Sequence, residues 1–149
     1  MTADALARDV RLYVFQEAAA TGYVPQAPQI SAALGRTEAD VRSALQELAA
    51  GRVLILAPHT STIWAANPFC AVASGFRVSA AGRRYSAICI WDALGIPAAL
   101  AADGVVTATC GDCGDAMTLD VAGGRLTDGD GVVHFALPPT RWWDNIGFT

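Results

Sequence analysis

The sequence predicts an α+β protein in which a three-helix unit is followed by a small antiparallel sheet with one embedded helix. Apolar residues recur at helical spacing over the first fifty residues, whereas the later part carries β-rich runs separated by Gly and Asp turns. The 149 residues are 53% hydrophobic and 16% charged, which is enough to build a core and too apolar for a disordered chain. We expect two units, over residues 1–66 and 67–149.

The first unit is predicted to contain three helices and a β-hairpin. Gly22, Gly35 and Gly51 each follow an apolar stretch of helical spacing, and the side-chain oxygen of Thr37 can cap the third helix. The helices are expected over 4–20, 29–34 and 38–50, and the hairpin strands over 53–57 and 62–66. Three helices followed by a hairpin form a winged-helix-like arrangement.

A winged-helix-like unit raises the question of DNA binding. Arg36, Arg42 and Arg52 lie near the third helix, where a recognition helix would be. Three nearby carboxylates offset them, and the whole chain has a net charge of −4. A duplex is held largely by positive charge, so the sequence favours a scaffold without a nucleic-acid partner.

The second unit begins after Asn67-Pro68, where β-rich segments and turns replace the helical pattern of the first unit. A strand, a turn at Gly82-Arg83 and a mostly apolar helix are expected first, and three further strands follow between Gly and Asp turns. The expected ranges are 76–80 for the first strand, 85–101 for the helix, and 105–110, 117–121 and 132–137 for the later strands. Pro97 is expected to kink or end the helix.

The sequence carries no signal for a membrane. No run approaches the roughly 18–20 apolar residues that a transmembrane helix needs. The first residues are acidic, unlike the basic start of a secretory signal. We therefore expect a soluble cytoplasmic protein whose cysteines are reduced.

Two of the four cysteines, Cys110 and Cys113, have the spacing of half a zinc site. A structural zinc ion needs four ligands, and only His59 and His134 could add to the pair. The sequence therefore favours a small turn with two thiols over a zinc site, and it predicts no cofactor. Redox pairing of the two thiols stays open as an alternative.

Cys89 and Asp92 are the residues with the clearest chemical potential. At a spacing of three they would share one face of the predicted helix, within an apolar segment. Burial there should raise the pKa of the carboxyl group, and a proton-bearing acid beside a soft sulfur suits attack on a soft centre with protonation of a leaving group. The alternative is an inert buried cysteine and an aspartate that reaches solvent.

The segment around this pair, Ile88-Cys89-Ile90-Trp91-Asp92-Ala93-Leu94-Gly95-Ile96-Pro97-Ala98, resembles the core motif of the alkylmercury lyase (organomercurial lyase) family. Several flanking segments resemble the family in the same order along the chain. They are Asn67-Pro68-Phe69, Arg77-Val78, Gly82-Arg83, Thr109-Cys110, Val133-His134-Phe135 and Arg141-Trp142-Trp143-Asp144.

The resemblance implies protonolysis of a carbon–mercury bond. Cys89 matches the thiolate that captures the organomercurial, and Asp92 matches the acid that protonates the departing carbon. The family's second reactive cysteine lies beyond the segment that resembles 146–149, so the chain is short at its C-terminus relative to the family pattern. Cys89, Cys110 and Cys113 are the candidate mercury ligands; Cys110 matches a cysteine that is generally structural in the family.

The partners implied by the resemblance are an organomercurial substrate, cellular thiols and a mercuric reductase, in a mercury-resistance role. Two alternatives remain from the residues alone. One is a thiol-based protein that binds mercury or another soft metal without turnover. The other is a winged-helix regulator whose second unit senses a soft ligand.

Overall fold

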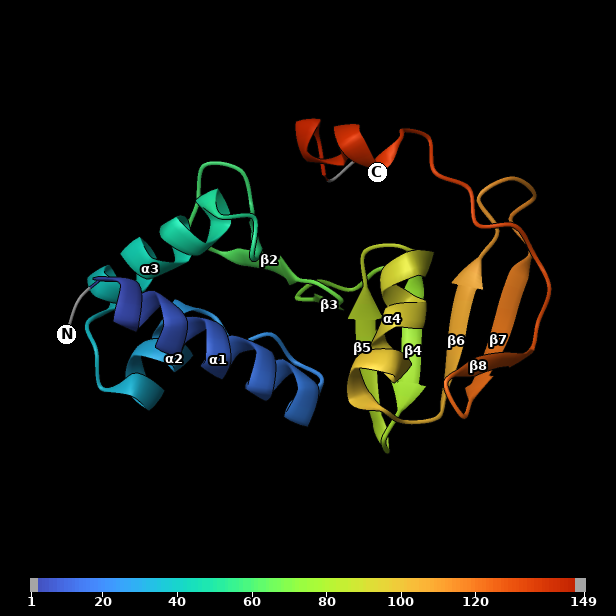
Figure 1. Cartoon of the computed structure of the whole chain (residues 1–149), viewed down its shortest axis with the longest axis horizontal. Helices are drawn as coiled ribbons and strands as arrows, with labels where there is room; N and C mark the ends of the chain where they lie inside the picture. Colours follow the sequence, from blue (N-terminus) through green and yellow to red (C-terminus); the bar gives the residue numbers. More distant parts are fainter. Residues whose placement is uncertain (1–2, 147–149) are drawn as a thin grey trace.

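The computed structural model of the chain describes residues 3–146, and Figure 1 shows the helical part beside the sheet-containing part. Helices and antiparallel strands occur together, so the predicted α+β class is confirmed. The first part comprises α1 (Ala3–Thr21), α2 (Ala27–Leu34), α3 (Glu38–Ala50), β1 (Ile55–Leu56), β2 (Ile63–Ala66) and β3 (Phe69–Cys70). The three strands form a small sheet in the order β1-β2-β3.

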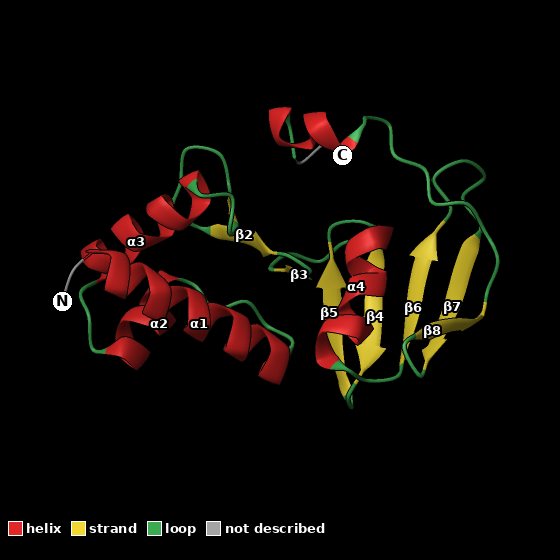
Figure 2. Cartoon of the chain, in the orientation of Figure 1, coloured by secondary structure: helices red, strands yellow, loops and turns green. Residues whose placement is uncertain are grey.

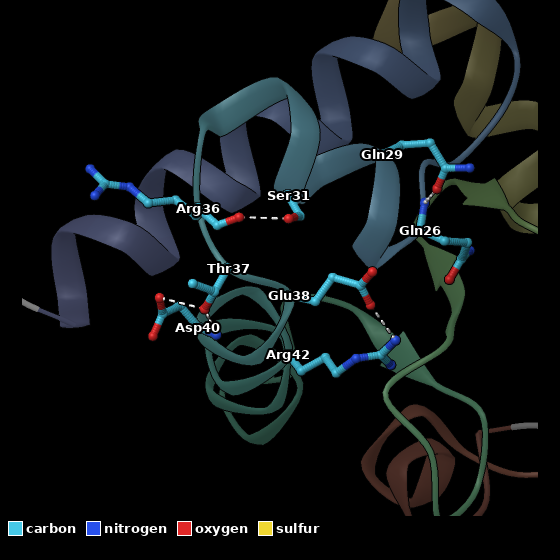
Figure 3. Close-up of polar contacts among 8 residues, drawn as sticks. All are labelled: Gln26, Gln29, Ser31, Arg36, Thr37, Glu38, Asp40 and Arg42. Atoms are coloured by element: carbon cyan, nitrogen blue, oxygen red, sulfur yellow. Dashed lines mark hydrogen bonds and ion pairs between the residues drawn. The ribbon is translucent and has the colours of Figure 1, made fainter.

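Polar side chains form local contacts at the ends of α2 and α3 (Figure 3), and one of them also joins α2 to the hairpin. Thr37 caps α3, because its hydroxyl oxygen accepts a 3.1 Å hydrogen bond from the amide of Asp40. Gln26, just before α2, donates to the carbonyl of Ile63 at 3.0 Å and accepts from the amide of Ile63 at 2.8 Å. The start of α2 is thereby joined to strand β2.

The second part is a five-stranded antiparallel sheet in the order β5-β4-β6-β7-β8, with helix α4 packed on it (Figure 2). Its elements are β4 (Phe76–Ala80), β5 (Arg83–Ala87), α4 (Ile90–Leu100), β6 (Gly104–Thr109), β7 (Ala116–Ala122) and β8 (Arg125–Asp128). Strands β5 and β6 flank β4 and run in the same direction, so α4 is the crossover between them.

The C-terminal half of α4 lies very close to strand β6. A methyl group at Gly104 would lie 3.1 Å from the Pro97 ring carbon Cγ and 3.0 Å from the Ser79 carbonyl oxygen, so only glycine fits there without a shift. Pro97 is buried inside α4, and the helix continues to Leu100 rather than ending at the proline. This contact fixes the height of the helix above the sheet.

One hydrophobic cluster runs through both parts of the molecule. The hydroxyl of Tyr85 on β5 donates a 2.9 Å hydrogen bond to the carbonyl of Ala19 at the end of α1. Gly22 follows α1 with a φ of +84°, and a Cβ at this position would collide with the carbonyl oxygen of Arg84. The end of α1 therefore docks directly on β5.

The helix expected over 85–101 is wrong in its first five residues. Tyr85 and Ala87 are buried and alternate with more exposed neighbours, and the whole segment Arg83–Ala87 pairs with β4 as strand β5. The turn before it, at Ala81 and Gly82, has positive φ at both residues and reverses the chain into a hairpin. Period-two burial is the physical reason for a strand here, and the apolar run that follows belongs to α4.

The strand expected over 132–137 is also wrong. Strand β8 comes earlier, directly after the Gly123-Gly124 turn, and pairs with β7. From residue 129 the chain leaves the sheet and runs to a short 3-10 helix, η1 (Pro139–Asp144). His134 is thus exposed in a loop rather than held in a sheet. The sequence also gave no sign of the two-residue strand β3.

The remaining fold predictions have different outcomes. The helices and the hairpin of residues 4–66 are present, with α2 starting two residues earlier and both hairpin strands shorter than expected. The winged-helix-like description and the division into 1–66 and 67–149 stay predictions. The resemblance over 147–149 lies outside the described residues. Within residues 3–146, no helix is both long and apolar enough to span a bilayer.

Candidate functional site

Cys89 and Asp92 meet at the N-terminus of α4. Cys89 is the N-cap residue, with extended backbone angles (φ −140°, ψ 176°), and its carbonyl accepts the first helical hydrogen bond from Ala93 at 3.0 Å. Asp92 is three residues further on, in the first turn. Cys89 therefore precedes the helix instead of lying on its face, and its sulfur sits beside the first-turn amides.

Opposing effects act on the thiol of Cys89, which is half-buried. Burial is the largest and raises its pKa, while the backbone amides of Asp92 and Trp91 act in the opposite direction by favouring the thiolate. The negative charge of Asp92, and a hydrogen bond from the thiol to its carboxylate, raise the pKa further. The net result is a pKa above the usual value for cysteine, so the resting thiol keeps its proton.

The environment of Asp92 also favours its neutral form. Burial raises the pKa of its carboxyl group, and the hydrogen bond from Cys89 only partly opposes this. The two side chains thus act on each other in a partly buried site. The sequence-based prediction of a raised Asp92 pKa is supported by this geometry.

Cys70 is a further thiol near this pair. It lies on β3, is 5% exposed, and its sulfur donates to the carbonyl of Trp64 at 3.6 Å. Burial raises its pKa, and the charge of Asp92 contributes in the same direction, which puts the two groups within electrostatic reach. The sequence gave no distance between Cys70 and Cys89, because β3 belongs to the three-stranded sheet and α4 packs on the five-stranded one.

Cys110 and Cys113 lie together in the turn between β6 and β7. The turn is closed by hydrogen bonds from the Cys110 amide to the Asp115 carbonyl at 2.8 Å and from the Gly114 amide to the Cys110 carbonyl at 3.0 Å. The amides of Cys113 and Asp112, with the thiol of Cys113, lower the pKa of Cys110. The Asp115 amide lowers the pKa of Cys113. Hydrogen bonds of the Cys113 thiol with Cys110 and Asp115 raise that pKa, and the overall shift is upward.

An aromatic group lies next to the Cys89–Asp92 pair. Trp91 is 63% exposed, and its ring meets that of Phe135 edge-on with centroids 6.4 Å apart. Phe135 in turn packs on Trp142 at 4.8 Å, and the indole nitrogen of Trp142 donates to the Leu137 carbonyl at 2.9 Å. The chain after β8 is therefore folded over the start of α4. The sequence analysis had not linked Trp142 to Trp91.

Two surface hollows lie elsewhere. Two hollows of about 740 and 550 Å³ are lined by residues of β4 and β5 together with β6 and the α1–α2 loop, among them Ser79 and Arg84, and neither includes Cys89 or Asp92. Within residues 3–146, His, Cys, Asp and Glu side chains form no group of three or more that could hold a metal ion. The pair at α4 is therefore identified by its chemistry rather than by a cavity.

The arginines considered for DNA have intramolecular partners. Arg42 pairs with Glu38 at 2.8 Å, and the guanidinium of Arg52 lies 5.4 Å from the ring centre of Trp143. The backbone carbonyl of Arg36 accepts a hydrogen bond from Ser31. The absence of a nucleic-acid partner stays a prediction.

These features define an α+β protein with a thiol and a carboxyl group of raised pKa at the N-terminus of a helix that packs on a sheet. The alkylmercury lyase family model matches residues 69–149, which is more than half of the chain and includes both residues. The chain belongs to the alkylmercury lyase family.

A solved structure described as the mercury-bound form of MerB2 has a similar fold. The TM-score is 0.56 and the sequence identity 18%, over 83% of this chain and 66% of that one. This chain therefore spans slightly less than two thirds of the length of that structure. A search of curated proteins finds no match.

Proposed function

We propose that this protein cleaves carbon–mercury bonds by protonolysis, with Cys89 as nucleophile and ligand and Asp92 as proton donor. The observation that carries the proposal is the juxtaposition of the Cys89 thiol and the Asp92 carboxyl group, whose pKa is raised by burial, at the N-terminus of α4, in a chain of the alkylmercury lyase family. Thiolates are soft donors and bind soft heavy metals in preference to oxygen or imidazole groups. The pair thus unites a mercury ligand with an acid.

In the first step the sulfur of Cys89 bonds to mercury and displaces the anionic ligand of the organomercurial. The thiol proton passes to the Asp92 carboxylate, with which it is already hydrogen-bonded. The amides of Trp91 and Asp92 stabilise the sulfur while it is negatively charged. The high resting pKa of Cys89 is no obstacle, because bond formation to mercury releases the proton as it proceeds.

In the second step the carboxylic acid of Asp92 gives that proton to the carbon bonded to mercury. The electron pair of the carbon–mercury bond forms the new carbon–hydrogen bond, a hydrocarbon leaves, and mercury remains as Hg²⁺ on sulfur. Burial of Asp92 favours this transfer, because the neutral acid is the form that the site prefers. A second sulfur on mercury would weaken its bond to carbon.

The experiment is a thiol-supported turnover assay. The purified chain is incubated with a simple alkyl- or arylmercury salt and excess monothiol, and the released hydrocarbon is measured by gas chromatography. We expect release by the parent chain and none by Cys89→Ser, with Cys113→Ser as a matched cysteine control that keeps the first turnover. Retention of the intact organomercurial on Cys89 without hydrocarbon would refute lyase activity and favour the mercury-binding alternative.

The ion left on Cys89 must then pass to other thiols. Cellular monothiols and a mercuric reductase are the acceptors that the family resemblance suggests, and both remain part of the proposal. Repeated turnover in the same assay should therefore depend on the monothiol concentration. The first turnover should not.

A further inference from the structure

The cysteines of the β6–β7 turn lie at the same edge of the sheet as Cys89. In the register of the sheet, Arg77 of β4 pairs with Ser86 of β5 on one side and with Thr107 of β6 on the other. Cys89 and Cys110 are each three residues beyond this row, in strands that run in the same direction. Figure 1 shows the first turn of α4 and the β6–β7 turn at one end of the sheet.

The register also sets the distance between the two sites. Strands β5 and β6 are separated by β4, so their backbones lie about 10 Å apart, twice the spacing of neighbouring strands. The groups that act on the Cys89 thiol do not include Cys110, whereas the thiols of Cys110 and Cys113 act on each other. The turn is therefore a separate site, close to the place where an ion would be released.

The turn itself is built to present two sulfurs. Its two closing hydrogen bonds, at 2.8 and 3.0 Å, use backbone groups alone and leave both sulfurs available. The two sulfurs are in hydrogen-bonding contact, and Cys113 is exposed while Cys110 is partly so. Neither takes part in a disulfide. Two adjacent thiols match the preference of Hg²⁺ for two sulfur ligands, with no need for the third and fourth ligands that zinc requires.

We propose that Cys110 and Cys113 form a second mercuric-ion site, a chelating dithiol that receives the ion released from Cys89. This proposal rests on the proposed function for its source of mercury. A cellular monothiol carries the ion across the gap by ligand exchange. Cys110 and Cys113 each form a bond to mercury while its two bonds to monothiol sulfur break, and the two cysteine protons pass to the departing monothiolates, with mercury in the +2 state throughout. The second sulfur–mercury bond is intramolecular, so the dithiol outcompetes free monothiols.

The test uses mercuric chloride in excess β-mercaptoethanol and does not depend on lyase activity. All variants carry Cys89→Ser, and mercury retained per chain is measured after desalting, together with the ultraviolet sulfur–mercury absorption. We expect one tightly held ion per chain in Cys89→Ser. Addition of either Cys110→Ser or Cys113→Ser should lower retention at least about tenfold. Addition of Cys70→Ser, which removes the same number of thiols, should leave it unchanged.

Equal retention with and without Cys110→Ser would overturn the dithiol site, as would loss caused by Cys70→Ser alone. Circular dichroism checks that each variant is folded, which we expect because the turn is closed by backbone hydrogen bonds. A parent chain that releases no hydrocarbon but retains mercury at Cys110 and Cys113 would refute the proposed function and support this site. The two proposals are thereby tested separately.

Discussion

Cys89 and Asp92 occupy the N-cap and the third residue of the same helix, α4. In a common capping box a Ser or Thr and a Glu hold these two positions and satisfy first-turn amides. Here a thiol and a shorter carboxyl group take the places, and the sulfur gains the stabilising environment of the helix N-terminus. A position that ordinarily serves helix stability is thus available for chemistry.

Asp92→Asn should separate mercury capture from bond cleavage. Asparagine is close in size but has no proton of comparable acidity to give to carbon. We expect the variant to bind an organomercurial through Cys89 while its rate of hydrocarbon release falls by about 10²–10⁴-fold, the usual contribution of a general acid. Gas chromatography and mercury analysis of the same samples measure both steps. An unchanged rate of release would exclude Asp92 as the donor.

The same substitution should change the reactivity of Cys89. The charge of Asp92 and the hydrogen bond that its carboxylate accepts both raise the pKa of the thiol, so their removal should shift the midpoint of its alkylation to lower pH. Iodoacetamide labelling across a pH series, read by mass spectrometry of the Cys89 peptide, measures the shift. Cys110 provides an internal control, because its pKa is lowered and it should react at lower pH than Cys89 in every sample.

Ionised, buried Asp92 should also lower the free energy of unfolding at neutral pH. Burial raises its pKa, so the folded chain binds the proton more tightly than the unfolded chain. That contribution to stability is present below the ordinary aspartate pKa and is lost as the pH rises through the folded value. The gain in unfolding free energy of Asp92→Asn over the parent chain should therefore be larger at pH 7 than in acid, as measured by urea unfolding. A gain that shrinks as the pH rises would contradict this sign.

Gly22→Ala should loosen the contact between α1 and the sheet. Alanine is strained at the positive φ of this position, and its Cβ would collide with the carbonyl oxygen of Arg84. Gly35→Ala is the matched control, because Gly35 has a φ of +61° and open space around it. We expect Gly22→Ala to lower the unfolding free energy by about 1–3 kcal/mol more than Gly35→Ala. Equal losses would mean that the close approach of Arg84 has no energetic weight.

Trp142→Ala should release the chain that lies over the start of α4. The indole ring packs on Phe135 and donates to the Leu137 carbonyl, so its removal breaks both contacts. We expect faster proteolytic cleavage within residues 129–138 under native conditions. Mass spectrometry of the fragments over time measures the rate. Leu126→Ala removes an exposed apolar side chain on β8 and serves as the control. Unchanged cleavage after Trp142→Ala would show that other contacts hold the segment.

The sequence was most informative where one pattern repeats. Helices α1 and α3, strands β4, β6 and β7, and the chemical pairing of Cys89 with Asp92 all follow from spacing or a family motif. It failed at β5, because Tyr85 to Ala87 adjoin the apolar run of α4 without a break and short segments of this kind suit either structure. It also failed at 132–137, where Phe135 packs on Trp142 and Trp91 and the segment pairs with no strand.

Contacts between distant segments could not be predicted. Nothing local to Cys70 indicates that it lies in reach of Asp92, since that depends on how β3 packs beside β5. The same holds for Trp91 and Phe135, which are brought together by the path of the chain after β8. The shared edge of Cys89 and Cys110 needs the strand order, which places β4 between β5 and β6.

The tight fit of Pro97 on Gly104 has a consequence at the far end of α4. Cys89 lies eight residues, or about 12 Å, along the axis from Pro97, so the helix acts as a lever with its pivot at the proline. A side chain at Gly104 that tilted the helix by roughly 5° would swing the sulfur by about 1 Å, a misplacement large enough to slow a positioned reaction about a hundredfold. The position of the Cys89 sulfur thus depends in part on Gly104, which lies outside the candidate site.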